Sequence, residues 1–345
     1  MSYEPFLEVL RGGRVESIHQ GALAVADAQG KLVAWAGDPQ VNPFMRSSAK
    51  PFQALPLIES GAAEAFGLTD RQLAVICGSH AGTPEHLEVV DSIQRAAGIA
   101  EAELQCGVHP PYDGAEARRL RAAGETPRIN HNNCSGKHSG MLALAVHLGA
   151  PRLSYLERDH PVQRRILAAV SQMSGVPEAL IGLGVDGCSA PNFALPLQAA
   201  ATAFARLADP AGLPAASGDA CRRVFQAMAA NPRMVSGPTG FDTRLIEFGG
   251  SRWIAKGGAE GYYGMALRPG AVRPGSPALG VALKIADGDA ARRATTPVVL
   301  AILNELGWSG TGDPAFHLEF GPRHLQNWRG LDVGETRVVL DLQRS

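Results

Sequence analysis

The sequence predicts an α+β fold in which one mostly antiparallel sheet is built from strands at both ends of the chain. Three observations support this prediction. Strand-like segments fill residues 6–37 and return after residue 242, and the stretch between them has the pattern of helices. The 345 residues include 40 glycines and 24 prolines, which implies many turns between short elements. An α/β sandwich with helices on the faces of the sheet and a helical middle lobe accounts for this order most simply.

The individual elements follow from turn and start signals. The Asp27-Ala28-Gln29-Gly30 stretch predicts a turn between two strands, and Thr83-Pro84-Glu85 predicts a helix start. The first strands are expected over residues 6–13, 14–30 and 31–37. Helices are expected over residues 51–60, 70–77, 84–97, 137–148, 161–173, 193–207 and 219–230. Strands are then expected over residues 243–250, 251–258, 260–270 and 280–288, a helix over 290–306 and a last strand near 336–342.

We expect one structural unit over residues 1–345. Residues 1–47 and 236–345 are predicted to form the sheet, and residues 48–235 are predicted to be mainly helical. A groove between the helical part and the sheet is a natural place for a binding site.

Composition excludes several classes of protein. The 32 Lys and Arg residues nearly balance the 33 Asp and Glu residues, which argues against a nucleic-acid partner and gives no reason to bind anionic lipid. The first residues carry charge throughout, and no apolar stretch reaches 18 residues, so neither a signal peptide nor a membrane span is expected. Five cysteines without a signal sequence favour reduced thiols and a cytoplasmic location.

Three short motifs carry hydroxyl and amine groups. Ser47 and Lys50 are three residues apart at a predicted helix start, so the hydroxyl and the amine lie on one face. Ser79 stands in a glycine-flanked loop, and Lys256 leaves a predicted strand directly into Gly257. Taken singly, these motifs are also typical of a helix cap with a solvated lysine, a connecting turn and a hairpin turn.

Together the three motifs are more specific. Their order and their placement on helix, helix and strand match the S-x-x-K, S-D-N and K-T-G series of serine β-lactamases and penicillin-binding proteins, although the second and third match only approximately. A second lysine near the serine would also push one amine towards its neutral form.

Two cysteines stand in glycine-rich polar loops. Cys134 precedes a predicted helix, which favours a thiolate, and Cys188 follows Asp186-Gly187. Such a pair is able to bind Zn²⁺ with a nitrogen ligand and a water. Because the sequence has no C-x-x-C spacing, structural thiols or a disulfide remain alternatives.

The motifs in their sequence context resemble the rhizobial-type L-asparaginases, also called the thermolabile or asparaginase II family. The resemblance runs from about residue 6 to residue 286 and is carried by the segments RSSAKPFQALPLIESGA, CGSHAGTPEHLEVV, NHNNCSGKHSGMLALA, GVDGCSAPNFALPL and KGGAEG. It implies a fold similar to serine β-lactamases and glutaminases, hydrolysis of L-asparagine to L-aspartate and ammonia, and a homodimer.

The resemblance also implies residue roles. Ser47 would be the nucleophile with Lys50 as its base, and Ser79 with Lys256 would form a second tandem that relays protons. The implied zinc ligands are Cys134, Lys137 and Cys188, with water as the fourth ligand. The implied substrate-binding residues are Asp186, Arg46 and His138.

Two departures separate the chain from penicillin-recognising enzymes. Gly257 stands where they have a threonine hydroxyl, and Ala81 stands where they have an asparagine. Two other functions remain as alternatives: another serine acyl hydrolase of the β-lactamase or glutaminase type, and a non-catalytic amino-acid-binding protein.

Overall fold

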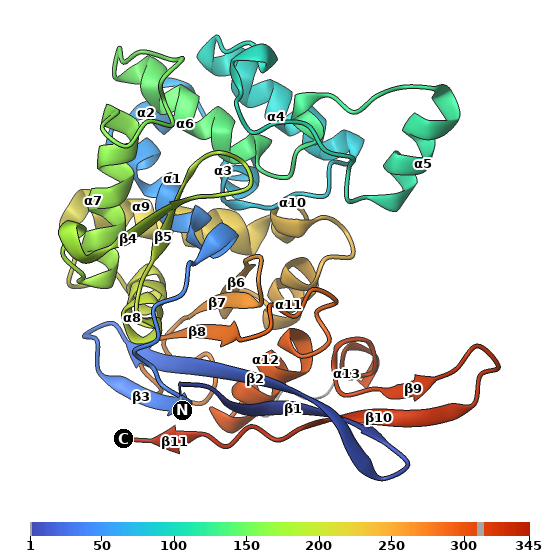
Figure 1. The fold of residues 1–345 in the computed structure, drawn as a ribbon. Helices are drawn as coiled ribbons and strands as arrows, with labels where there is room; N and C mark the ends of the chain where they lie inside the picture. The colour runs from blue at the N-terminus through green and yellow to red at the C-terminus, as the bar shows by residue number, and fades with distance from the viewer. Residues whose placement is uncertain (1, 309–313) are drawn as a thin grey trace.

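The computed structural model describes residues 2–308 and 314–345, and within them nine strands form one antiparallel sheet (Figure 1). The strand order is β6-β7-β8-β2-β1-β10-β9, and β3 pairs with both β2 and β11. The strands are β1 (Glu4–Arg11), β2 (Arg14–Asp27), β3 (Leu32–Ala36), β6 (Trp253–Gly257), β7 (Tyr262–Leu267), β8 (Leu279–Ile285), β9 (His324–Gln326), β10 (Asp332–Val338) and β11 (Gln343–Arg344). The predicted sheet from both ends of the chain, and with it the α+β fold class, is confirmed.

Strand β2 joins the two ends of the chain. Its residues from Arg14 to Gly21 pair with β1, and its last seven residues, from Gly21 to Asp27, pair with β8. The side chains of this second half are almost all buried, whereas most of those between Arg14 and Ile18 are exposed. The N-terminal and C-terminal strands are therefore parts of one sheet with one shared core.

Helices fill the middle of the chain and continue after it. They are α1 (Lys50–Glu59), α2 (Ala62–Ala65), α3 (Asp70–Cys77), α4 (Pro84–Ala97), α5 (Gly114–Ala123), α6 (Ser135–His147), α7 (Pro161–Ser174), α8 (Leu197–Ala208), α9 (Ala215–Ala230), α10 (Pro232–Ser236), α11 (Phe241–Gly249), α12 (Thr295–Glu305) and α13 (Pro314–Phe320). Helix α1 packs against α3, α6, α7 and α9, and nine of its ten residues are buried. Helix α1 therefore begins inside the protein, at the buried residue Lys50.

Helix α8 lies on strands β2, β7 and β8 (Figure 1). Two strand glycines allow this close approach. A Cβ atom at Gly264 would stand 2.1 Å from the ring of Phe204, and one at Gly280 would stand 1.8 Å from the carbonyl oxygen of Ala201. Neither strand position has room for a larger residue.

Several predicted elements agree with the structure, and two are wrong. The helices predicted over residues 70–77 and 84–97 are confirmed. Residues 243–250, predicted as a strand, belong to helix α11, in which Phe241, Leu245, Ile246 and Gly249 recur on one buried face. The helix predicted from residue 193 begins instead at Leu197, because residues before Pro196 form strand β5 (Pro191–Ala194) of a two-stranded hairpin with β4 (Gly182–Val185).

Among the helices of the described residues, none has the length and apolar character that crossing a bilayer requires.

Replacing Gly280 by Ala tests the packing of α8 on the sheet. The added methyl group would overlap the backbone of Ala201, so we expect the free energy of unfolding to fall by about 3 kcal/mol. Gly212→Ala is the matched control, because its Cβ would meet no atom within 4 Å. Urea denaturation of both variants measures the difference, and equal stability of the two would contradict the close packing.

Candidate active site

Lys50 brings the first two motifs together. A 3-10 turn, η1 (Arg46–Ala49), leads directly into α1, and the Lys50 side chain is 1% exposed. Its amine donates hydrogen bonds to the carbonyl oxygens of Gly78 at 2.6 Å and Asn133 at 3.2 Å. It also lies 3.0 Å from the Ser79 hydroxyl. Lys50 therefore connects the end of α3 with the loop that carries Cys134.

Ser47 lies at the same turn, where its carbonyl oxygen accepts from the backbone N–H of Lys50, but its hydroxyl is not bonded to the Lys50 amine. Its side chain is half-buried, and its hydroxyl has no hydrogen-bond partner within residues 2–308 and 314–345. The hydrogen-bonded Ser-Lys pair is Ser79 with Lys50. The three-residue spacing brought Ser47 and Lys50 to one turn, yet the long lysine side chain extends past the serine into the interior.

The third motif adjoins this turn through Ser48 and Gly258. The buried Ser48 hydroxyl donates to the carbonyl oxygen of Lys256 at 2.6 Å. A Cβ atom at Gly258 would stand 2.7 Å from the carbonyl oxygen of Met45, so only glycine allows η1 to lie this close to the end of β6. The first and third motifs are thus held together by a buried hydrogen bond and a backbone contact.

Lys256 is buried at the end of β6. Its amine donates to the carbonyl oxygen of Gly257 at 2.6 Å and lies 3.4 Å from a carboxylate oxygen of Asp242. Burial lowers the pKa of Lys256 to about 8, and the positive charges of Lys50 and Arg292 act in the same direction, while Asp242 opposes them. An amine with this pKa loses its proton readily near neutral pH.

Cys134, Lys137 and Cys188 also meet. Cys134 caps the start of α6, and Cys188 lies in the loop between β4 and β5. The Lys137 amine is 3.0 Å from the sulfur of Cys188, and all three side chains are at most 5% exposed. A hydrogen bond from Cys188 holds the pKa of Cys134 well below its usual range, and both sulfurs keep the Lys137 pKa raised despite burial.

These three side chains fit a zinc ion by their chemistry. Two sulfurs and one amine converge at a buried point, and thiolates are preferred zinc ligands. Both cysteines are free thiols, so the disulfide alternative is wrong. No cluster of three or more His, Cys, Asp or Glu side chains suited to a metal occurs in the described part of the chain, and the third donor here is a lysine.

The three predicted substrate-binding residues separate into two places. Arg46 donates to Asp186 at 2.7 Å, and Asp186 also accepts from the backbone N–H of Gly187. His138 is fully buried and bonds through Nδ1 to the Tyr155 hydroxyl at 2.5 Å. Arg46 and Asp186 thus form an ion pair next to Ser47 in the chain. His138 is instead buried next to Cys188 and Tyr155.

Comparison with known proteins identifies the family. The model of the L-asparaginase II family matches residues 7–338. The chain belongs to the L-asparaginase II family. It is therefore an enzyme of the amidohydrolase type, and the family resemblance found in the sequence is confirmed.

Solved structures also match this L-asparaginase II family member. A probable glutaminase from Bacillus subtilis, complexed with 6-diazo-5-oxo-L-norleucine, is 13% identical, covers 84% of each chain and has a TM-score of 0.38. A β-lactamase from Mycobacterium bovis is 12% identical, covers 83% of this chain and 95% of its own, and has a TM-score of 0.43. No match was found among curated proteins.

The sequence missed two features of the site. Asp242 lies directly before the strand expected over residues 243–250 and belongs to no motif. His109 stands outside every motif, yet its Nε2 accepts a hydrogen bond from the backbone N–H of Asn133, whose carbonyl oxygen accepts from Lys50. Tyr112 stacks on His109 with ring centroids 4.9 Å apart. A His and a Tyr three residues apart in a proline-rich loop gave no distinguishing pattern.

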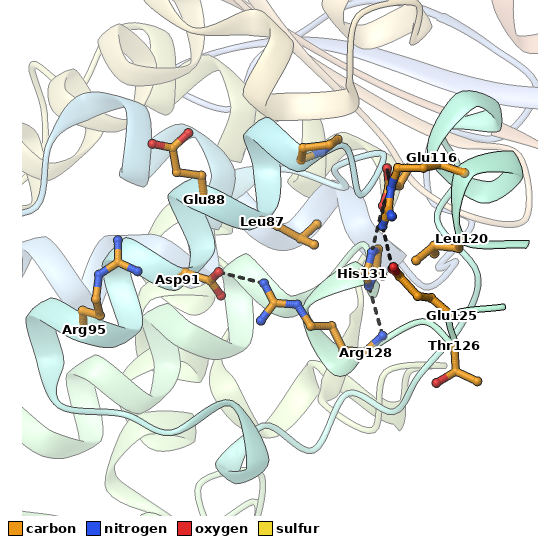
Figure 2. A pocket seen from close by; sticks show the side chains of 12 residues that line it. Leu87, Glu88, Asp91, Arg95, Glu116, Leu120, Glu125, Thr126, Arg128 and His131 are labelled. Carbon is orange, nitrogen blue, oxygen red and sulfur yellow. Dashed lines mark hydrogen bonds and ion pairs between the residues drawn. The ribbon is translucent and has the colours of Figure 1, made fainter. Parts of the chain in front are cut away.

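One large cavity lies away from these residues. It measures about 510 Å³ and lies between α4 and α5, where His131 lies between Glu116 and Arg128 (Figure 2). None of the ten predicted site residues lines it. A second cavity of about 300 Å³ is lined by Gly257, Gly258 and Arg292 and adjoins Lys256. Chemistry and not cavity size therefore identifies the candidate active site.

Two stacked histidines lie beside Ser79. His80 Nδ1 accepts from the Gly82 N–H, so its Nε2 carries the proton and donates to the Ser135 hydroxyl at 2.9 Å. His86 Nε2 donates to the carbonyl oxygen of Arg233, and the two rings are 5.2 Å apart. Burial lowers the pKa of both histidines, so both are neutral at pH 7.

These histidines predict a loss of stability in acid. Below about pH 6.5 the unfolded chain binds protons that the folded chain cannot take, so the free energy of unfolding falls as the pH falls. His86→Gln should make this fall smaller, because Gln does not titrate. At the same helix position it can still accept from the backbone N–H of Thr83, so the helix cap is kept. Urea denaturation at pH 7.5 and pH 5.0 measures it, with the exposed His324→Gln as control. An unchanged pH dependence in His86→Gln would refute the assignment.

Proposed function

We propose that this amidohydrolase converts L-asparagine and water to L-aspartate and ammonia. The observation that carries the proposal is the contact between the buried Lys50 amine and the Ser79 hydroxyl, one turn from the unbonded Ser47 hydroxyl, in a chain of the L-asparaginase II family. A hydroxyl bonded to a buried amine is able to exchange a proton with it, which is what a serine nucleophile nearby needs from its base.

In the proposed reaction, Ser47 Oγ attacks the carbon of the substrate's side-chain amide. Its proton passes to Lys50, and Ser79 and Lys256 relay protons onward. Ser79 suits this task because a hydroxyl both donates and accepts hydrogen bonds. Lys256 suits it because burial lowers its pKa to about 8. Backbone N–H groups at the start of the helix are the proposed donors to the developing oxyanion.

The tetrahedral intermediate that this attack forms then collapses. The bond between carbon and nitrogen breaks, the nitrogen takes a proton and leaves as ammonia, and an aspartyl ester remains on Ser47. A water molecule attacks this ester, gives one proton back to the Ser47 oxygen through the lysines, and releases L-aspartate.

Arg46 and Asp186 are the proposed contacts for the two ends of the amino acid. The carboxylate of Asp186 would take the α-ammonium group, and the guanidinium of Arg46 would take the α-carboxylate. Their ion pair at 2.7 Å keeps both charges in place when no substrate is bound. His138 is proposed to support the cysteine loop, because it is fully buried against Tyr155.

Cys134, Lys137 and Cys188 are the proposed ligands of a Zn²⁺ ion. When bound, zinc supplies a fixed positive charge that orients polar groups of the substrate. Lys137 is able to ligate a metal only after it loses its proton.

Replacing Ser47 by Ala tests the reaction. We expect Ser47→Ala to lose at least about 1000-fold in kcat, because the substitution removes the proposed nucleophile. Ammonia release from L-asparagine measures this, with Ser17→Ala, at an exposed serine of β2, as control. Wild-type turnover in Ser47→Ala would show that Ser47 is not the nucleophile.

The same assay separates the competing functions. L-glutamine turned over as fast as L-asparagine, or hydrolysis of a chromogenic cephalosporin, would indicate another serine acyl hydrolase. Binding of L-asparagine without release of ammonia would indicate a binding protein.

The zinc ligands give a further prediction. Loss of a second-shell partner typically weakens metal binding 10- to 100-fold, so loss of a ligand in Cys134→Ser or Cys188→Ser should weaken it by more than about 100-fold. Competition with a zinc chelator measures the affinity. Cys221→Ser is the control, because this buried thiol packs against Met173 elsewhere. Equal zinc affinity in all variants would exclude this set of ligands.

A further inference from the structure

Asp242 is a buried carboxylate that none of the predicted roles includes. It stands in the first turn of α11 and is 1% exposed. Its Oδ2 accepts a hydrogen bond from the backbone N–H of Gly257 at 2.9 Å and lies 3.4 Å from the Lys256 amine. One carboxylate thus holds both the side chain of Lys256 and the peptide that follows it.

The other groups that face Lys256 do not stabilise its positive charge. Lys50 from α1 and Arg292 from the loop before α12 are cations and repel it. Cys77 from α3 is a neutral thiol, because burial raises its pKa to about 12. Tyr263 from β7 is neutral as well, because burial raises its pKa well above its usual value. Within residues 2–308 and 314–345, Asp242 is the one carboxylate in contact with the Lys256 amine.

We propose that Asp242 is a positioning residue that holds the Lys256 amine in place and determines how readily this amine gives up its proton. The contribution of Asp242 to catalysis rests on the proposed function, in which Lys256 relays protons. The contact itself does not depend on that function.

Asp242 also explains why the third motif reads Lys-Gly-Gly. A Cβ atom at Gly257 would stand 3.2 Å from Asp242 Oδ1 and 3.4 Å from the ring of Tyr263, which is closer than most real contacts of this kind. The carboxylate therefore occupies the space that a side chain at position 257 would need. In the Lys-Thr-Gly motif a hydroxyl follows the lysine, whereas here an anion beside the lysine takes its place.

The balance of charge gives this contact its effect. Burying an ammonium group favours its neutral form, and the neighbouring cations Lys50 and Arg292 strengthen that preference. Asp242 opposes both and keeps the Lys256 pKa at about 8, near the pH at which an enzyme works. Without this anion, the Lys256 pKa would be lower still, and this amine would hold a proton less readily near neutral pH.

A titration of Lys256 tests the proposal directly. The chain has only five lysines, so the Cε signals of ¹³C-labelled lysine can be resolved by NMR and Lys256 assigned by its loss in Lys256→Gln. Asp242→Asn keeps an oxygen that accepts from Gly257 but removes the charge. We expect it to lower the midpoint of the Lys256 titration by about one pH unit or more. Asp159→Asn, whose side chain is 97% exposed, should leave that midpoint unchanged.

A second variant disturbs the same contact without removing the charge. The methyl group of Gly257→Ala would press on Asp242 Oδ1 and move the carboxylate away from Lys256. We expect a smaller downward shift of the same midpoint, which also covers the case in which Asp242→Asn does not fold. An unchanged or raised midpoint in the folded variants overturns the proposal.

Activity separates this inference from the proposed function. In one outcome the Lys256 midpoint falls and the acidic limb of the pH profile of kcat/KM moves to lower pH with it. That outcome supports both the control of Lys256 by Asp242 and the proton relay through Lys256. If the midpoint falls while the limb stays, Asp242 controls Lys256 as proposed, and the place of Lys256 in the proton relay is wrong.

Discussion

The burial of three lysine amines is the constraint on which the rest of this site depends. Only five of the 32 basic residues are lysines, and Lys50, Lys137 and Lys256 are each at most 3% exposed. An arginine would keep its charge in such a place, whereas an amine can exist in both protonation states. A buried ammonium group needs a partner, and each of the three has a different one. Lys50 bonds to carbonyl oxygens and a hydroxyl, Lys137 to a sulfur, and Lys256 to a carbonyl oxygen and a carboxylate.

These partners come from distant parts of the chain, so the amines are satisfied only when the helices and the sheet are assembled. Lys50 at the start of α1 reaches residues 28 and 83 positions away, and the Lys137 amine meets a sulfur 51 positions away. The Ser48 hydroxyl joins η1 to β6 across 208 positions. Folding and site formation are therefore one event, because a misplaced helix would leave a buried charge unpaired.

The sequence predicts much of the fold, because local signals agree with the final structure. Helices α3 and α4 begin after Thr69 and Thr83, which cap them, and the apolar strands at both ends pair into one sheet. Helix α11 was missed because its short apolar run is compatible with either element, and packing decides between them. The same holds at the site. Glycine-flanked Ser, Lys and Cys residues were visible in the sequence, but Asp242 is defined by a contact with β6 that no local pattern encodes.

The partners of Lys50 give the two serines different properties: the Ser79 hydroxyl is bonded to this amine, and the Ser47 hydroxyl is not. The carbonyl oxygens of Gly78 and Asn133 are fixed by the backbone and only accept hydrogen bonds. Among these three oxygen partners, only the Ser79 hydroxyl can both accept a hydrogen bond from Lys50 and donate one, so a proton that leaves this amine towards one of them must pass through Ser79. Within the described residues the Ser47 hydroxyl has no such bond to break, which is consistent with the role proposed for it as the nucleophile. An amine held in place by two fixed acceptors, beside one exchangeable hydroxyl, is organised before the substrate arrives.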